Sequence, residues 1–312
     1  MRGWLIVVAA VSAATIGCVG STEPVAPPII EEPDPDPEPS PQSPGTPTGT
    51  ESIYLATADG VVTMRLTTGA RPAWSPDGQR IAFQRDGSVY VINVDGSGDV
   101  RLRLGKSPAW SPDGTRLAFT SSDGIAVMNV DGSAVRTLVR HDLRDDTDAP
   151  SDQGVDKPAW SPDGSRIAFE HLGDGDMMPA QVFVMGADGS NPRTVTSSPD
   201  RRWYAESDPS WSPEGSKIVH WSYGYGIAAT DHSGGVPNTL YSAFPQVAYG
   251  TKPVWSRVGI IAFTRGRSPM SSPAVWTLTL ASREARQVIA NGYDADWSPS
   301  GSRIAFVSTR IQ

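Results

Sequence analysis

The sequence predicts an all-β fold made of a ring of six blades, each an antiparallel sheet of four strands. A motif that reads PAWSPDGxRIAF in its best copies recurs around six tryptophans: Trp74, Trp110, Trp160, Trp211, Trp255 and Trp297. These tryptophans are 36, 50, 51, 44 and 42 residues apart, a period range typical of repeat architectures. Strand-forming residues alternate with turn signals, and no long apolar segment with a helical period follows residue 20. Together these observations predict a six-bladed β-propeller.

Each copy of the motif encodes a hairpin. In the first copy we expect a short strand at 72–74, a tight turn at 75–78 and a return strand at 81–83. The turn is predicted because Pro presets φ, Asp bonds its own backbone and Gly accepts a positive φ. The repeat aspartates are therefore interpreted as turn residues, and the repeat tryptophans as packing between neighbouring blades.

A second hairpin follows most copies. In the first unit its strands are expected at 89–93 and 100–104, with a turn at 95–97, and the pattern recurs at 125–138 and 182–195. Two hairpins give four antiparallel strands, which is one blade.

The two ends of the predicted domain complete each other. Residues 53–66 read as a second hairpin with no first hairpin before it, whereas 297–306 read as a first hairpin with no second after it. We therefore predict that N-terminal strands pair with the C-terminal blade and close the ring, which leaves few open sheet edges.

The motif, followed by a strand, an xDGS turn and a short basic-apolar strand, resembles the repeat of TolB-like propellers. The resemblance covers residues 51–312, well in five copies and poorly around Trp255. It implies a six-bladed propeller domain over that range. This fold serves many roles, so the resemblance implies the fold more strongly than a function.

The first residues read as an export signal. Residues 1–17 comprise a short positive start and an apolar run of 13 residues at 4–16, too short to span a bilayer comfortably. Residues 14–18 resemble the bacterial lipoprotein box, which implies lipidation of Cys18, the sole cysteine. We expect an exported lipoprotein, membrane-anchored and facing the periplasm or the cell exterior. The alternative is an ordinary secretory signal cut nearby.

Residues 18–50 are predicted to be a disordered linker. Ten prolines and six acidic residues, with no basic residue, stand between 21 and 50, which favours an extended spacer between the anchor and the domain. An unselected tail is the alternative. Residues 51–312 then carry 25 basic and 28 acidic residues, so no basic field exists that would hold nucleic acid.

Strand alternation divides the domain into two faces. The first and third turns of each blade must share one face, and the second turn and the link to the next blade share the other. The second face, the loop face, holds nearly all of the length variation, concentrated over blades 3 to 5. Its candidate binding residues are His141, His171, Arg201, Arg202, Trp203, Tyr204, Tyr223, Tyr225, Arg265 and Arg267.

These residue types favour binding over catalysis. Trp, Tyr and Arg are the usual anchors of protein interfaces, and aromatics beside arginines also stack on sugar rings. We predict a monomeric, non-enzymatic module without a cofactor, which binds an envelope protein or a glycan. Solvated loops without a partner are the alternative.

The sequence contains no G-x-S-x-G, H-E-x-x-H or G-x-x-x-x-G-K-[ST] motif. The enzyme class that stays open is a metal-dependent polysaccharide lyase or another carbohydrate-acting propeller enzyme. His141 and His171, with Asp142 or Asp174, are the candidate Mn²⁺ or Ca²⁺ ligands, although their spacing matches no established ligand motif.

Overall fold

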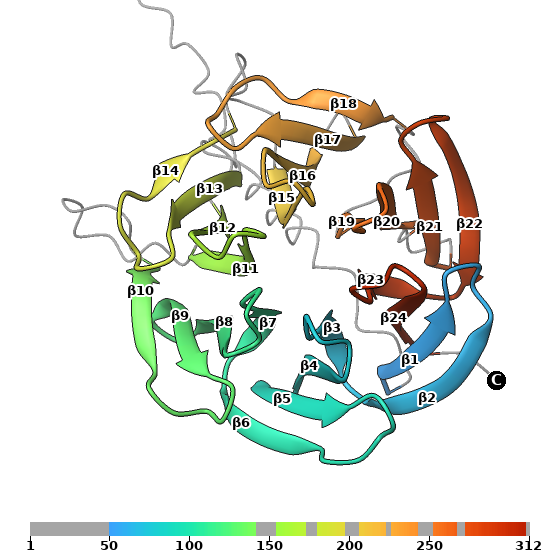
Figure 1. Cartoon of the computed structure of the whole chain (residues 1–312), viewed down its shortest axis with the longest axis horizontal. Helices are drawn as coiled ribbons and strands as arrows, with labels where there is room; N and C mark the ends of the chain where they lie inside the picture. Colours follow the sequence, from blue (N-terminus) through green and yellow to red (C-terminus); the bar gives the residue numbers. More distant parts are fainter. Residues whose placement is uncertain are drawn as a thin grey trace, which may run out of the picture. The chain divides into compact units, whose positions relative to one another are not determined.

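The structure, a computed structural model, describes residues 50–141, 154–172, 180–196, 206–222, 226–242, 252–266 and 272–309. These residues form six four-stranded antiparallel sheets arranged around a central axis (Figure 1). The predicted six-bladed β-propeller is therefore confirmed. Within the described ranges no helix is long and apolar enough to cross a membrane. The predicted signal peptide (1–17) and the predicted linker up to residue 49 lie outside these ranges.

The strands of each blade follow the chain from the axis outward in blades 1 to 5. Blade 1 consists of β3 (Ala70–Trp74), β4 (Arg80–Arg85), β5 (Ser88–Asn93) and β6 (Val100–Leu104). Blade 2 consists of β7 (Lys106–Trp110), β8 (Arg116–Ser121), β9 (Gly124–Asn129) and β10 (Arg136–Arg140). Blade 3 consists of β11 (Val155–Trp160), β12 (Arg166–His171), β13 (Gln181–Gly186) and β14 (Arg193–Thr194).

Blades 4 and 5 have the same order. Blade 4 consists of β15 (Glu206–Trp211), β16 (Lys217–Ser222), β17 (Gly226–Asp231) and β18 (Asn238–Tyr241). Blade 5 consists of β19 (Val254–Trp255), β20 (Ile260–Arg265), β21 (Ala274–Thr279) and β22 (Glu284–Ala290). Blade 6 combines both ends of the domain in β23 (Tyr293–Trp297), β24 (Arg303–Ser308), β1 (Ser52–Thr57) and β2 (Val62–Thr68).

Blade 6 confirms the predicted ring closure. β1 pairs antiparallel with β24 in an unbroken register from Ser52↔Ser308 to Thr57↔Arg303. The Ile53 and Leu55 side chains pack in the same buried cluster as Trp74 and Phe83 of blade 1. The closing pair is therefore held by main-chain hydrogen bonds within the blade and by apolar burial against the next blade.

The repeat tryptophans pack between blades, as predicted. Five of the six are 6–8% exposed, and Trp255 is half-buried. Trp110 Nε1 donates to the Ala73 carbonyl of the preceding blade at 3.1 Å. The Arg80 guanidinium lies 4.8 Å from the Trp110 ring centroid, a cation–π contact that also joins blades 1 and 2.

One buried position breaks the repeat. Five blades place a fully buried phenylalanine in the second strand: Phe83, Phe119, Phe169, Phe263 and Phe306. Blade 4 places His220 there, with no exposed surface and with Nε2 at 2.8 Å from Thr230 Oγ1. Burial lowers the pKa of His220 to about 4, so the imidazole is neutral at pH 7.

The innermost strand of each blade carries a residue with a left-handed backbone. These six residues have φ between 35° and 56°: Arg71, Ser107, Lys157, Asp208, Lys252 and Asp294. Five of them precede a proline. In blade 1 the ladder shifts register between Ala70 and Ala73, around Arg71. Such a bulge redirects a side chain, and the left-handed conformation is unfavourable for residues other than glycine.

Neighbouring blades hold these bulges in place. The Ser107 N–H donates to Gln84 Oε1 of blade 1 at 3.1 Å, and the Asp294 N–H donates to Thr264 Oγ1 of blade 5 at 3.2 Å. A strained backbone persists only where its surroundings determine it, and these contacts supply that support.

Candidate functional site

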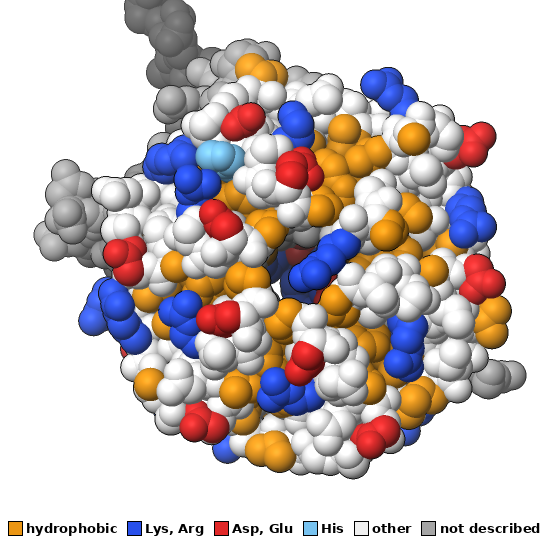
Figure 2. Space-filling view, viewed as in Figure 1, with side chains coloured by type: hydrophobic (Ala, Val, Ile, Leu, Met, Phe, Trp, Pro, Cys, Tyr) orange, Lys and Arg blue, Asp and Glu red, His pale blue; other side chains and the backbone are white. Residues whose placement is uncertain are grey.

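The innermost strands surround a channel along the axis, with one end on each face. On the face of the first and third turns, a space-filling view is hollowed at its centre, and a basic side chain lies across the hollow (Figure 2). The cavity at this end has a volume of about 690 Å³. Its outermost ring consists of Pro76, Pro112, Pro162, Pro213, Pro299 and Arg257, and we call it the proline end.

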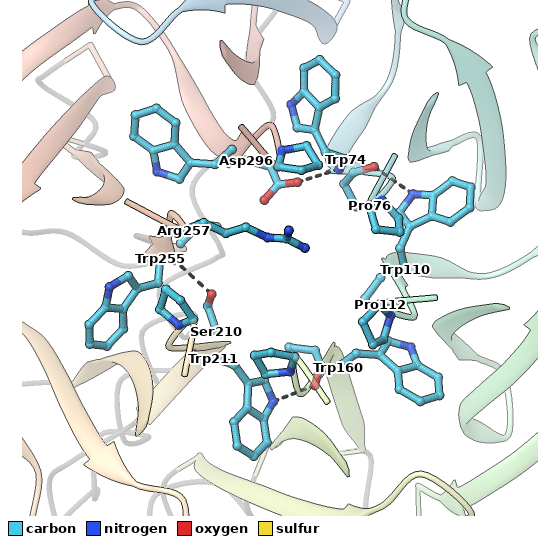
Figure 3. Close-up of a pocket in the computed structure, with 18 of the residues that line it drawn as sticks. Trp74, Pro76, Trp110, Pro112, Trp160, Ser210, Trp211, Trp255, Arg257 and Asp296 are labelled. Carbon is cyan, nitrogen blue, oxygen red and sulfur yellow. Dashed lines mark hydrogen bonds between the residues drawn. The ribbon is translucent and has the colours of Figure 1, made fainter. Parts of the chain in front are cut away.

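Arg257 takes the place of the sixth proline. It lies in the β19–β20 turn, whose Gly259 N–H donates to the Ser256 carbonyl at 3.2 Å, as the glycines of the other five turns do at 2.8–2.9 Å. The closing hydrogen bond of the turn is therefore kept while its second residue changes, although this hairpin is one residue shorter: the Ser256 N–H donates to the Ile260 carbonyl, four residues on, where the other five span five residues. The Arg257 side chain extends into the cavity toward the wall that carries Trp110 and Pro112 (Figure 3). The residue is exposed, and among the described residues no ion pair or hydrogen bond involves its guanidinium.

The next ring inward is small and mostly apolar. It consists of Ala73, Ala109, Ala159, Ser210, Val254 and Asp296. Asp296 Oδ2 accepts a hydrogen bond from the Trp74 N–H of blade 1 at 2.6 Å, and Ser210 Oγ accepts one from the Trp255 N–H of blade 5 at 3.3 Å. Burial raises the pKa of Asp296, and the nearby Lys252 ammonium opposes that shift. These two side chains thus accept hydrogen bonds from main-chain N–H groups on the innermost strand of the next blade, whose inner edge has no neighbouring strand.

Alanine stands at the corresponding position in blades 1, 2 and 3. Alanine side chains have no acceptor, and neither does Val254 of blade 5, so the N–H groups of Trp110, Trp160, Trp211 and Trp297 lack the partner that Trp74 and Trp255 have. The first three of these main-chain donors come from neighbouring blades, 2 to 4, and stand together at the wall of the cavity. Buried donors are normally paired with protein, water or a ligand.

The other end of the channel is charged. A second cavity of about 130 Å³ adjoins the first and is lined in part by Arg71, Lys157, Asp208 and Lys252. These residues have a left-handed backbone and stand at the beginnings of the innermost strands or, for Lys252, two residues before the strand, toward the loop face. We call the six left-handed residues the charged ring; it includes Ser107 and Asp294 as well.

Ion pairs connect the charged ring across blades. Lys157 Nζ lies 3.1 Å from Asp208 Oδ1 and 2.9 Å from Glu170 Oε2, and Arg71 Nη1 lies 3.5 Å from Asp208 Oδ1. Burial alone would raise the pKa of Asp208, but Lys157 and Arg71 outweigh it and hold this pKa at about 2. Burial raises the pKa of Glu170, and Lys157 opposes the shift.

Lys252 contributes a further buried cation. Its Nζ donates to the Pro72 carbonyl of blade 1 at 3.1 Å. Burial lowers the pKa of Lys252, and Asp296 and Asp294 oppose that shift. Buried charges are costly unless they are paired, so this end of the channel depends on all of its partners.

Three of the predicted loop-face residues are described, and each has structural contacts. The Arg265 guanidinium lies 4.5 Å from the Trp276 ring centroid and donates to Tyr241 Oη at 3.2 Å. His141 Nε2 lies 3.0 Å from the Ser121 carbonyl oxygen. The His171 ring packs against Phe183 with the centroids 5.4 Å apart.

The two predicted histidines, His141 and His171, both lie beside Val155. Val155 pairs with His171 across the β11–β12 ladder and donates its N–H to His141 Nδ1 at 3.1 Å. No group of three His, Cys, Asp or Glu residues able to hold a metal occurs among the residues that the structure describes. Asp142 and Asp174 lie outside them, so the metal alternative stays untested.

The other predicted site residues also lie outside the described ranges: Cys18, Arg201, Arg202, Trp203, Tyr204, Tyr223, Tyr225 and Arg267. Their roles stay predictions. The sequence reasoning missed Arg257 and the charged ring. Arg257 has a clear signal, because it occupies a repeat position that is proline in the other five copies. The charged ring has a weaker sequence signal, namely that the residue just before each copy of the motif varies from blade to blade.

No protein-family model matches the sequence, and no curated protein matches it. Solved structures do match. A putative TolB from Agrobacterium tumefaciens has 17% identity and a TM-score of 0.68 over 85% of this chain and 100% of that chain. TolB from Acinetobacter baumannii has 16% identity and a TM-score of 0.56 over 85% of this chain and 65% of that chain.

An oligogalacturonate lyase in complex with manganese has 13% identity and a TM-score of 0.52 over 85% of this chain and 98% of that chain. A chain of a nidogen/laminin complex has 11% identity and a TM-score of 0.56 over 83% and 97% of the two chains. At these identities the likeness is one of fold. The chain has the six-bladed propeller fold of the TolB proteins to which it is similar.

Proposed function

We propose that this propeller is a non-enzymatic binding module of the cell envelope, which holds an envelope protein or glycan on its loop face over blades 3 to 5. The TolB-like fold fits a protein-binding propeller. The observation that supports the proposed face is the cluster formed by Lys157, Glu170 and Asp208 at the loop-face end of the channel.

The location of this cluster supports that sector. Lys157 and Glu170 belong to blade 3 and Asp208 to blade 4, the blades whose connecting segments are longest in sequence. Buried ion pairs seldom add net stability over an apolar core, so their retention favours a role in positioning or specificity.

Alanine substitutions of the predicted anchors test the proposed face. The variant Trp203→Ala/Tyr204→Ala should weaken partner capture by roughly 30-fold, since loss of an interface hot spot costs about 2 kcal/mol or more. The free energy of unfolding should stay within about 1 kcal/mol of that of the parent protein. Asp86→Asn, in the short second turn of blade 1 on the same face, is the matched control. Unchanged capture by the double variant, or equal loss in the control, would refute the proposed sector.

The proposal includes a lipid anchor at Cys18. Acyl chains on this residue would hold the domain at a membrane, because membrane affinity rises with each buried methylene group. Cys18→Ala should move the protein from the membrane fraction to the soluble fraction after cell lysis. A distribution identical to that of the parent would end the anchoring proposal and leave the binding proposal intact.

A metal-dependent carbohydrate-acting enzyme is the rival function. It is supported by the likeness in fold to an oligogalacturonate lyase in complex with manganese and by the position of His141 and His171 beside Val155 on the loop face. To bind a metal, His141 would exchange its contact with the Val155 N–H or with the Ser121 carbonyl for the ion. Metal analysis of the purified full chain separates the two functions. Stoichiometric Mn²⁺ or Ca²⁺ that is lost in the variant His141→Gln/His171→Gln would favour the enzyme.

A further inference from the structure

We propose that the proline end of the channel is a second site, which binds a ligand through a single carboxylate. The site lies on the face opposite the proposed partner site and does not depend on it. Its wall carries Arg257 and the main-chain N–H groups of Trp110, Trp160 and Trp211. The ligand is either the free C-terminus of a short peptide or a small organic acid, since both present the same group.

Arg257 is the only basic side chain in the outermost ring of the cavity, and the direction in which it extends indicates a role in binding. The turn that carries it has the same glycine and the same closing hydrogen bond as the proline-containing turns, so the fold does not need an arginine there. The side chain extends over the cavity and not outward into bulk solvent (Figure 3). A guanidinium without a protein partner presents paired donors that match a carboxylate.

The wall supplies further donors on the side toward which Arg257 extends. Blades 6 and 4 place Asp296 and Ser210 against the inner N–H groups of Trp74 and Trp255. Blades 1 to 3 place only alanine methyl groups against the N–H groups of Trp110, Trp160 and Trp211, and blade 5 places Val254 against that of Trp297. Three of these four donors are contiguous and lie on the side toward which Arg257 extends, and they can bond to the carbonyl oxygens of a ligand whose carboxylate meets Arg257.

Charge and size limit the ligand. One guanidinium matches one carboxylate, and Asp296 on the same wall would repel a second negative charge. A phosphate dianion is therefore disfavoured. The volume of about 690 Å³ lies in the range of pockets that bind small molecules and accommodates a ligand the size of a short peptide.

Nuclear magnetic resonance of the full chain labelled with ¹⁵N-tryptophan tests the site directly. The probes are acetyl-trialanine with a free C-terminus, the same peptide as its C-terminal amide, and butyrate. The free acid should shift the main-chain signals of Trp110, Trp160 and Trp211, while those of Trp74 and Trp255 change little. Shifts with butyrate as well would identify a small organic acid, and shifts with the peptide alone would identify a peptide C-terminus.

Variants of Arg257 supply the second readout. Arg257→Gln should weaken binding of the free acid at least tenfold, and Arg257→Lys should retain part of the affinity. Arg283→Gln is the matched control, since Arg283 is an exposed arginine in the third turn of the same blade and on the same face. Equal shifts with the acid and its amide, or unchanged affinity in Arg257→Gln, would overturn the proposal. Partner capture on the loop face should be the same in all three variants.

Discussion

The two ends of the channel are made by the same six strands, yet they differ in chemistry. At the proline end the second position of each turn favours proline, because proline presets the φ that the turn needs there. Only Arg257 departs from this pattern. At the charged end the left-handed position fixes the backbone but not the side chain, so each blade carries its own residue. Chemistry that belongs to one blade therefore appears where the repeat constrains the backbone without specifying the side chain.

The largest expected effect comes from removing one charge at the charged end. Asp208→Ala leaves Lys157 and Arg71 without their shared carboxylate, and breaking a buried ion pair in this way costs about 3–5 kcal/mol. Urea denaturation measures the free energy of unfolding. Arg257→Ala, at the other end, should change it by no more than about 0.5 kcal/mol. Similar losses in both variants would remove the distinction between a buried and an open end.

Acid should affect the core of blade 4 before it affects the channel. The His220 pKa is lowered to about 4 in the folded state, so the unfolded state binds more protons at any pH between 4 and 6.5. The contribution of His220 to folding stability should therefore fall by about 3 kcal/mol as the pH drops from 6.5 to 4. Glu170 and Asp296, whose pKa values burial raises, contribute a slope of the opposite sign, so the comparison with a His220 variant isolates the histidine.

His220→Phe, which restores the residue of the other five blades, should flatten this part of the pH profile. The Asp208 pKa is about 2, so the stability from its ion pairs is present above the ordinary aspartate pKa and is lost only as the pH falls from about 4 toward 2. An unchanged slope between pH 6.5 and 4 in His220→Phe would show that another group titrates there.

A smaller effect is expected within the middle ring. Asp296→Ala gives blade 6 the residue of blades 1 to 3 and leaves the Trp74 N–H without its acceptor. Loss of a hydrogen-bond partner costs about 1–2 kcal/mol, at the lower end where water reaches the group. Ser210→Ala should cost less, since its hydrogen bond to the Trp255 N–H is longer. Chemical denaturation of the two variants gives the order, and the reverse order would contradict it.

The smallest expected effect has the opposite sign. Arg257→Pro completes the proline ring in a turn that keeps the closing hydrogen bond of the other five, within a hairpin one residue shorter, so it should stabilise the fold by about 0.4–1 kcal/mol. The melting temperature measures the gain. A destabilised variant would mean that the shorter hairpin does not hold residue 257 at the φ that proline requires.

Much of the fold could be predicted from the sequence, because turn chemistry and tryptophan spacing are local and repeated six times. The pairing of N-terminal and C-terminal strands in blade 6 could also be predicted, because residues 53–66 lack a first hairpin and residues 297–306 lack a second one. The burial of His220 was not predicted, since a histidine is a polar residue and the rest of its copy of the motif matches the repeat well.

The site was harder to predict. Where Lys157 and Asp208 point depends on a bulge that only the structure shows, and their pairing joins residues from different blades. Arg257 was visible as an exception to the motif, but its direction into a cavity required coordinates. The loop residues around Trp203 gave a compositional signal only, and it stays a prediction.

Photo-crosslinking from defined positions tests the central claim most directly, namely that a partner meets the loop face over blades 3 to 5. A photoreactive phenylalanine is placed in turn at Tyr204, Tyr223, Asp86 and Val258 in living cells. Asp86 is an exposed residue in the short second turn of blade 1 on the loop face, and Val258 is an exposed residue at the proline end. We predict one crosslinked partner from Tyr204 and Tyr223 and none from the other two. The same partner from Asp86 or Val258, with none from Tyr204 and Tyr223, would contradict the account.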